Sequence, residues 1–203
     1  MTKRYDQAYF DRWYRDPGRR VWGVADVERK VRLVLGIAEF LLDRRVRSVL
    51  DVGCGEGTWQ PILKRLRPAA RYQGVDGSAY VVRRFGRRRH IRLGTLGCLA
   101  DLGLDGPLDV VVCCDVLHYV ETAELRRGLR EISGLVRGVA YLEAYTSADD
   151  VSGDESDFQR RAPAEWRRLF RAAGFIPVGM QCYVGPAMQG VPVALEKPKP
   201  TGA

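Results

Sequence analysis

Several features that would mark this 203-residue chain as a membrane or exported protein are missing from its sequence. No run approaches the roughly 18 consecutive apolar residues of a membrane span. The start, Met1 to Trp13, lacks the continuous apolar segment of a secretory signal, so we expect a cytoplasmic protein with no membrane partner. The five cysteines are odd in number and contain no C-x-x-C pair, which predicts reduced, mostly buried thiols.

Lysine is also scarce, since only five of the 33 basic residues are lysine and the other 28 are arginine. The formal net charge of +8 is compatible with binding of nucleic acid or phosphate. Because arginine is spread over nearly every segment, we interpret the charge as a general compositional bias. The densest basic cluster, residues 83–92, is interpreted as a solvated face, with nucleic-acid or phosphate contact as the alternative.

The amino-acid composition and the hydrophobic pattern of the chain predict one globular domain. Apolar residues make up 46% of the chain and charged residues 29%, which excludes wholesale disorder, and no internal repeat is present. Short apolar runs alternate with amphipathic stretches, which is typical of βαβ units and of a parallel sheet covered on both faces. The expected strands are 47–52, 71–76, 91–96, 108–114, 138–145, 175–184 and 191–196. The expected helices are a stripe from Val27 to Leu42 and residues 58–67, 78–86, 121–136 and 163–173.

The predicted fold class is therefore α/β, a single domain with a doubly wound, seven-stranded, mostly parallel sheet and helices on both faces. The last two expected strands have only residues 185–190 between them, so we expect an antiparallel C-terminal hairpin. Residues 1–23 form an aromatic and basic arm, the domain is expected to span 24–196, and 197–203 are expected to be a disordered tail. An acidic loop, 149–157, follows the fifth expected strand.

The most informative stretch is the end of the first expected strand, where three glycines alternate with other residues. Gly53, Gly55 and Gly57 suit a turn that needs positive φ and a close approach of a ligand to the backbone. In an open α/β sheet, ligands bind beyond the carboxyl ends of the strands. Nineteen residues after Gly57, Asp76 ends the second strand, and its carboxylate can accept hydrogen bonds from both hydroxyls of a ribose. The loop and the acid together predict a nucleoside site.

The chain resembles the class I S-adenosylmethionine-dependent methyltransferases over roughly residues 30–196. The resemblance rests on the glycine motif at residues 50–57, the acid in 74–76, the segment 108–119 and the terminal strand pair. A dinucleotide-binding loop would instead read G-x-G-x-x-G, which this chain does not.

The resemblance implies S-adenosylmethionine as cofactor and S-adenosylhomocysteine as product. Asp51 and the backbone around Gly53 and Gly55 are then expected to hold the methionine part, and Asp76 the ribose. Gly94 is followed by Thr95 rather than the Asp common in relatives, so Thr95 and Leu96 are expected at the adenine. The full set expected to contact the cofactor is Tyr14, Asp51, Gly53, Cys54, Gly55, Asp76, Gly77, Thr95, Leu96, Cys114 and Asp115.

Candidate catalytic residues follow the fourth and fifth strands, and we expect them to face one crevice with Asp115. They are His118, Tyr119, Glu143 and Tyr145. His118 is the preferred general base because an imidazole titrates near neutral pH, while a purely structural histidine is the alternative. The Cys113-Cys114 pair lacks the preceding proline of pyrimidine-methylating relatives, and the partners for a metal site cannot be identified, so no metal is expected.

The chain lacks an added RNA-binding domain, which favours a small-molecule acceptor. Methyl transfer to RNA or another macromolecule and a non-catalytic nucleoside-binding protein remain alternatives. The atom methylated and the oligomeric state are not predicted. Because such a fold leaves its crevice open, we expect residues 5–22 to cover it, with cover of a sheet edge as the alternative.

Overall fold

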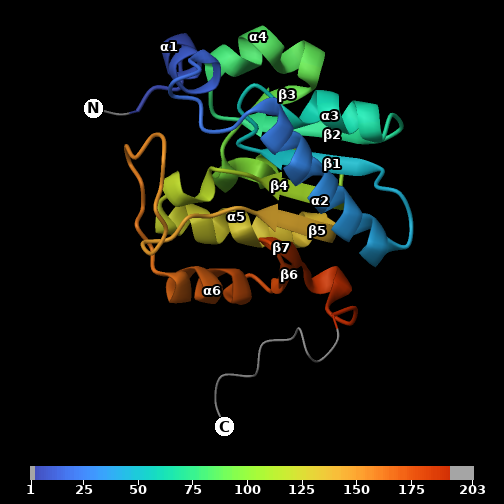
Figure 1. The fold of residues 1–203 in the computed structure, drawn as a ribbon. Helices are drawn as coiled ribbons and strands as arrows, with labels where there is room; N and C mark the ends of the chain where they lie inside the picture. Colours follow the sequence, from blue (N-terminus) through green and yellow to red (C-terminus); the bar gives the residue numbers. More distant parts are fainter. Residues whose placement is uncertain (1–2, 193–203) are drawn as a thin grey trace.

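A seven-stranded sheet forms the centre of the computed structural model, which describes residues 3–192 (Figure 1). The strands are β1 (Ser48–Val52), β2 (Arg71–Asp76), β3 (Ile91–Leu93), β4 (Leu108–Cys113), β5 (Val136–Leu142), β6 (Ile176–Gly179) and β7 (Cys182–Val184). Their order across the sheet is β3-β2-β1-β4-β5-β7-β6. The pairs from β3 to β5 are parallel, and β7 runs antiparallel to both β5 and β6.

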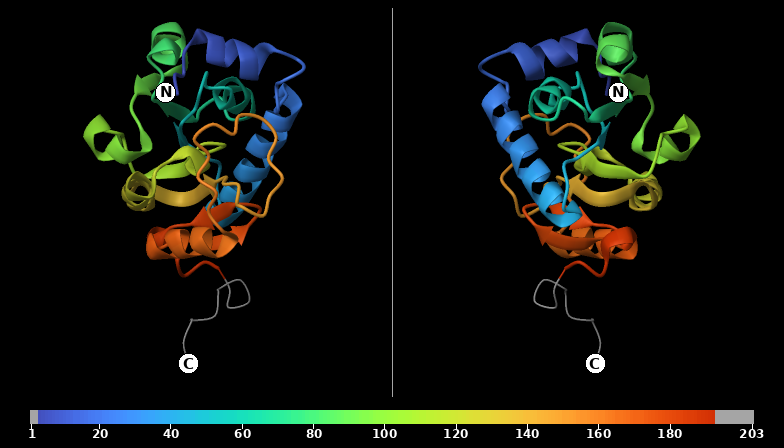
Figure 2. Two further views of the ribbon diagram at one scale, coloured as in Figure 1. Left: turned by 90° about the vertical axis from the view of Figure 1, so that its left-hand side faces the viewer. Right: turned by 90° about the vertical axis from the view of Figure 1, so that its right-hand side faces the viewer.

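Helices cover both faces of this sheet (Figures 1 and 2). On one face α2 (Val24–Leu42) and α3 (Trp59–Leu66) share an apolar core with β1, β4 and β5, built from residues such as Val34, Ile62 and Val110. On the other, α5 (Thr122–Leu135) and α6 (Pro163–Ala172) pack through Leu129 and Phe170. The short helices η2 (Leu96–Leu102), η3 (Leu117–Tyr119) and η4 (Pro186–Met188) lie in connections. The predicted doubly wound α/β class is confirmed.

Several expected strands differ from those observed. The expected strand 91–96 stops at Leu93, because Leu96 instead begins η2 and packs against α5. The expected strand 138–145 is observed as the shorter β5, which begins two residues earlier because α5 runs directly into it, and ends three residues earlier.

The expected strand 175–184 is two strands, which form a hairpin at Met180 and Gln181, both with positive φ. The antiparallel hairpin therefore exists, but its predicted position was wrong. The other expected strand, 191–196, is not formed at 191–192, and its remainder lies outside the described residues, as does the tail 197–203.

The N-terminal arm is folded onto the domain near the β3 edge of the sheet. It contains α1 (Gln7–Phe10) and a π-helical turn, η1 (Asp11–Arg15), and it turns at residues 17–19. Phe10 is buried beside Val81 and Phe85 of α4 (Ala79–Arg89), and α1 and α4 lie side by side in Figures 1 and 2. The arm is therefore an integral part of the packed domain.

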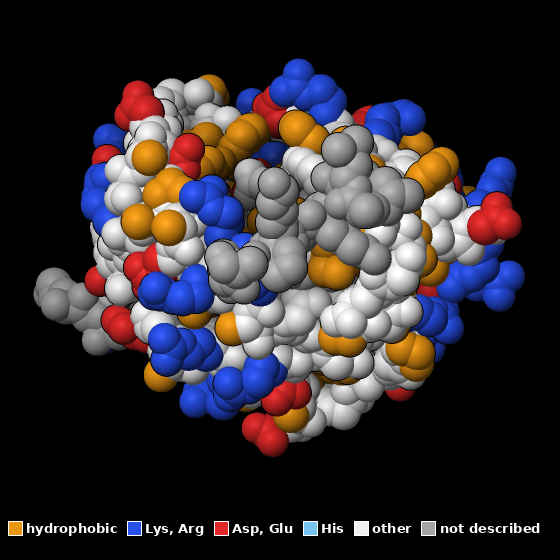
Figure 3. All heavy atoms as spheres, turned by 90° about the horizontal axis from the view of Figure 1, so that it is seen from below, with side chains coloured by type: hydrophobic (Ala, Val, Ile, Leu, Met, Phe, Trp, Pro, Cys, Tyr) orange, Lys and Arg blue, Asp and Glu red, His pale blue; other side chains and the backbone are white. Residues whose placement is uncertain are grey.

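Charged side chains of both signs are dispersed over the face of the molecule seen in Figure 3. On the face seen in Figure 3, Lys and Arg side chains lie in several groups with acidic side chains between them. Among residues 3–192, no helix is both long and apolar enough to cross a membrane. All five cysteines are free thiols, three of them buried, as the sequence predicted.

Candidate functional site

A cavity of about 570 Å³ opens at the carboxyl ends of β1, β2 and β4. The arm and the loop between β5 and α6 form its outer walls, through residues such as Tyr9, Tyr14 and Asp154. The cavity brings together most of the residues predicted from the sequence, namely Tyr14, Asp51, Gly53, Cys54, Gly55, Asp76, Gly77, Thr95, Leu96, Cys114, Asp115 and Tyr119.

The glycine loop has the backbone that its sequence predicted. Gly53, Gly55 and Gly57 have φ of 67°, 52° and 71°, a left-handed conformation that other residues adopt at a cost. A Cβ at Gly53 would collide with the Val116 side chain, and one at Gly55 would collide with the Tyr14 hydroxyl. The loop therefore requires glycine for both its conformation and its close contacts.

Asp76 is tied to this loop. Its carboxylate accepts N–H bonds from Gly55 at 2.7 Å and from Ser78 at 2.8 Å. Burial raises the pKa of Asp76, and the two backbone bonds oppose that rise. Each carboxylate oxygen retains a lone pair for a further donor, so Asp76 can hold the loop and accept ligand hydroxyls.

Asp51 lies deeper in the cavity floor and is only 2% exposed. The Tyr72 hydroxyl donates to its Oδ2 at 2.8 Å. Burial raises the pKa of Asp51 from 3.8 to about 7, against the effect of that hydrogen bond and together with the charge of Asp76. A cation bound nearby would favour the ionised form of Asp51.

The arm is fastened over the glycine loop by polar contacts. Arg15 pairs with Glu56, and the Ser78 hydroxyl donates to the Tyr5 carbonyl at 2.5 Å. Lys3 pairs with Asp154 of the opposite loop at 2.7 Å. The arm thus joins both rims of the cavity.

His118 does not face the crevice as expected. Its side chain is fully buried outside the cavity lining, enclosed by the rings of Tyr119, Tyr145 and Phe158. Neither imidazole nitrogen has a hydrogen-bond partner among the described residues, and Nε2 lies 3.3 Å from Oδ1 of Asp115. The expectation of a shared crevice was wrong here because the loop residue Phe158 stacks on the ring.

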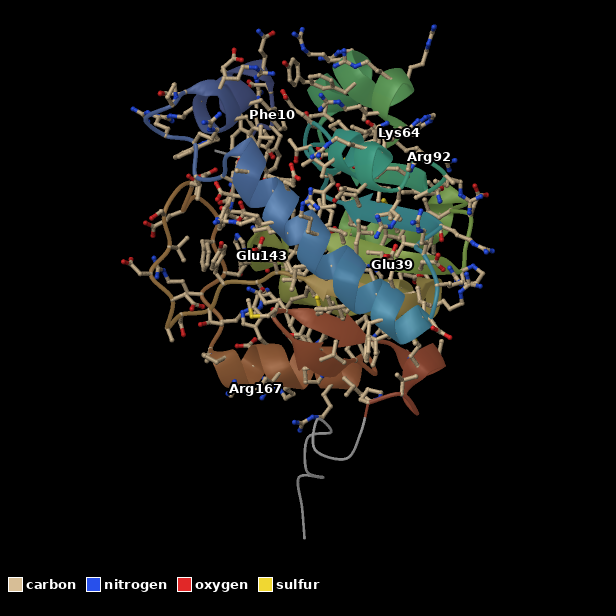
Figure 4. All side chains as sticks on the ribbon, turned by 45° about the vertical axis from the view of Figure 1, so that its right-hand side comes forward. Phe10, Glu39, Lys64, Arg92, Glu143 and Arg167 are labelled. Atoms are coloured by element: carbon tan, nitrogen blue, oxygen red, sulfur yellow. The ribbon has the colours of Figure 1, made fainter. Side chains whose placement is uncertain are left out.

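Glu143 and Tyr145 are also absent from the lining of the large cavity. Glu143 pairs with Lys30 at 2.7 Å and accepts hydrogen bonds from Tyr141 at 3.1 Å and from the Cys114 thiol at 2.8 Å. Figure 4 shows Glu143 beside the N-terminal half of α2. It lines a second cavity of about 500 Å³ that shares Trp22 and Lys30 with the first. Tyr119 is the one predicted catalytic residue that lines the large cavity.

Several lining residues were missed by the sequence analysis. Trp22 and Lys30 form a cation–π contact at 3.5 Å between the two cavities. Arg89 donates to the Glu56 carbonyl, and Glu124 accepts the Gly97 N–H at 3.0 Å. Lys30 and Glu124 lie near the N-terminal ends of helices that border the cavity, a position that could have identified them. Among residues 3–192, no group of three His, Cys, Asp or Glu side chains is placed to hold a metal ion.

Comparison with known proteins supports the same fold. Residues 50–139 match a family described as a methyltransferase domain. No curated protein sequence matches the chain significantly.

Among solved structures, one is an S-adenosylmethionine-dependent methyltransferase from Clostridium acetobutylicum ATCC 824, at 11% identity and a TM-score of 0.62, with 84% of this chain and 86% of that chain covered. Another is magnesium protoporphyrin IX methyltransferase from Synechocystis PCC 6803 with bound SAM, at 21% identity and a TM-score of 0.55, covering 88% and 89%. A third is the [4+2]-cyclase SpnF, at 23% identity and a TM-score of 0.58, covering 82% of this chain. The chain spans 63% of the cyclase's length.

Proposed function

We propose that this chain is a methyltransferase that transfers a methyl group from S-adenosylmethionine to a small-molecule acceptor, as the match of residues 50–139 to a methyltransferase domain supports. The observation that carries the proposal is the glycine loop at positive φ joined to Asp76 by the Gly55 N–H. A purely structural turn requires neither a buried carboxylate nor a cavity above it.

The residues present suit this cofactor. Asp76, Thr95 and Leu96 line the same cavity, where Asp76 would accept the ribose hydroxyls and Thr95 and Leu96 would contact the adenine. The cavity lining contains six carboxylates but only three cationic side chains, although the whole chain carries a formal charge of +8. An anionic lining in a basic protein suits a ligand that bears an ammonium and a sulfonium group.

When bound, the cofactor supplies an electrophilic methyl group on a good leaving group. The chain has chiefly to align the acceptor and exclude water. The Asp51 carboxylate would attract the cationic methionine part of the cofactor. The backbone of Gly53 and Gly55 would permit the cofactor to approach closely. Tyr14, above Gly55, and the Lys3–Asp154 contact limit the access of water from outside.

The partly covered cavity favours a small acceptor. The aromatic arm covers a space of about 570 Å³, within the usual range of small-molecule sites. The magnesium protoporphyrin IX methyltransferase among the similar structures acts on a small molecule, as its name states. Residues 5–22 are accordingly proposed as the lid. We further propose a cytoplasmic protein.

Binding and transfer need separate tests, since one similar structure is named as a cyclase. Calorimetry should show binding of both S-adenosylmethionine and S-adenosylhomocysteine. Labelled methyl groups should then enter a metabolite extract rather than total RNA, without the steep salt dependence of phosphate binding. Salt-sensitive incorporation into RNA would instead support a macromolecular acceptor. Cofactor binding without transfer to either would support a nucleoside-binding protein.

A further inference from the structure

Asp115 differs from the other carboxylates of the large cavity. Its Oδ1 lies 3.3 Å from Nε2 of the buried His118, and no lysine, arginine or backbone N–H among the described residues pairs with it. Its side chain is 42% exposed. The other five carboxylates each accept a hydrogen bond or pair with a cation, as Asp51 with Tyr72, Asp76 with Gly55 and Ser78, Glu56 with Arg15, Glu124 with Gly97 and Asp154 with Lys3.

The backbone at Asp115 is held in a left-handed conformation, with φ of 61°. Among non-glycine residues this conformation favours Asp and Asn. The next residue, Val116, packs so closely on Gly53 that a Cβ there would collide with it. Asp115 is thereby fixed beside the glycine loop, at the exit of β4 and within the cavity.

Three tyrosines share the cavity lining with this carboxylate. Tyr9, Tyr14 and Tyr119 line the same cavity, and the Asp115 charge adds to burial in raising the pKa of each. The phenols therefore stay neutral. One of these rings already accepts an ammonium group, since Lys3 Nζ lies 3.9 Å from the centroid of Tyr119. A carboxylate among neutral aromatic rings is the environment that favours an organic cation.

We propose that Asp115 binds an amino group of the acceptor, so that the substrates of this site are small amines with an apolar body. This inference rests on the proposed function and specifies its substrate class. The tyrosine rings would contact the apolar body and the carbons next to the nitrogen. Binding through Asp115 would place the nitrogen at the exit of β4, beside the glycine loop.

His118 acts in this account as a positioning residue. Its imidazole is fully buried and cannot contact the acceptor, but its Nε2 lies against Oδ1 of Asp115. With the ring fixed by Phe158 and Tyr119, His118 limits the directions in which the Asp115 carboxylate can turn.

The test uses matched probes and matched variants of the full chain saturated with S-adenosylhomocysteine. Benzylamine and benzyl alcohol have similar size and differ in charge, and their affinities are measured by ligand-observed NMR titration. Asp115→Asn keeps the side-chain size and tolerates the left-handed backbone. Asp101→Asn, at an exposed position outside the cavity lining, is the control.

We expect the wild type and Asp101→Asn to bind benzylamine at least tenfold more tightly than benzyl alcohol. Asp115→Asn should reduce that preference to less than threefold. Equal binding of the two probes by wild type, no binding of either, or a preference that survives in Asp115→Asn would overturn the proposal.

A further outcome assigns Asp115 to the cofactor instead. Asp115→Asn would then weaken S-adenosylmethionine binding more than S-adenosylhomocysteine binding and leave the probe preference unchanged, which also overturns the proposal. If the proposed function itself is wrong, the wild-type protein will bind neither S-adenosylmethionine nor S-adenosylhomocysteine. That result distinguishes failure of the proposed function from failure of the Asp115 proposal.

Discussion

Replacing Asp51 with Asn should make the protein more stable while weakening its hold on the cofactor. Asp51 is almost fully buried, and its hydrogen bond from Tyr72 does not offset the burial that raises its pKa to about 7. In the unfolded chain the same carboxyl has its ordinary pKa of 3.8. The folded protein therefore binds more protons than the unfolded chain between about pH 4 and pH 7.

The sign of the effect follows from this difference. Where the native state binds more protons, the free energy of unfolding falls as pH rises, so this destabilisation grows from about pH 4 and is complete above about pH 7. A rise in pKa from 3.8 to about 7 corresponds to roughly 4 kcal/mol. Asn carries no charge and can still accept the Tyr72 hydrogen bond. The variant should therefore exceed wild type in stability by up to about 4 kcal/mol at pH 8, and by little at pH 4.

Two assays on the same samples check this reasoning. Urea denaturation at pH 4.5 and 8 measures the stability difference, and calorimetry at pH 8 measures cofactor affinity. Both S-adenosylmethionine and S-adenosylhomocysteine should bind Asp51→Asn more weakly, by at least tenfold, because they share the cationic amino-acid part that we propose lies against Asp51. Asp101→Asn should match wild type in both assays. A variant that is less stable than wild type at pH 8 would show that the folded protein stabilises the ionised carboxylate of Asp51, so that its pKa is not raised.

Three further changes probe other parts of the site. Asp76→Ala should weaken binding of S-adenosylhomocysteine by roughly 2–4 kcal/mol, as calorimetry would show, and unchanged affinity in a folded variant would refute the ribose assignment. His118→Phe should raise the free energy of unfolding by about 1 kcal/mol, because it removes two unpartnered buried nitrogens, whereas a loss above 2 kcal/mol would contradict that view. Deleting residues 1–22 exposes the α4 surface beneath Phe10, so we expect a less stable but folded protein with little or no methyl transfer, and full turnover would exclude the lid. In the intact chain, bound cofactor should slow proteolysis within this arm.

The parts of the site that the sequence predicted are those with a local physical requirement. Positive φ and a close backbone approach demand glycine, so Gly53, Gly55 and Gly57 could be identified from type and spacing alone. Asp76 followed from its place at the end of a buried strand. Local pattern also sufficed for the order of the main strands and helices from α2 through α6.

Prediction from sequence was less successful where a non-glycine residue turns the chain. The β6–β7 hairpin turns at Met180 and Gln181, which have positive φ although neither residue type favours it. An apolar run continues across this turn, so the sequence resembled one long strand. Leu96 similarly looked like the end of a strand, yet its side chain fills the space above Gly128 of α5.

The catalytic candidates depended on contacts between distant segments. A histidine at the end of an apolar strand can face a cavity or be buried, and the choice depends on what packs against it. Here Phe158 stacks on His118 from forty residues away, which leaves Asp115, three residues earlier, as the group that faces the cavity. Lys3 reaches Asp154 across a still longer separation. The proposed cofactor half of this site is thus encoded locally, whereas the proposed acceptor half is defined by segments that meet only in the folded chain.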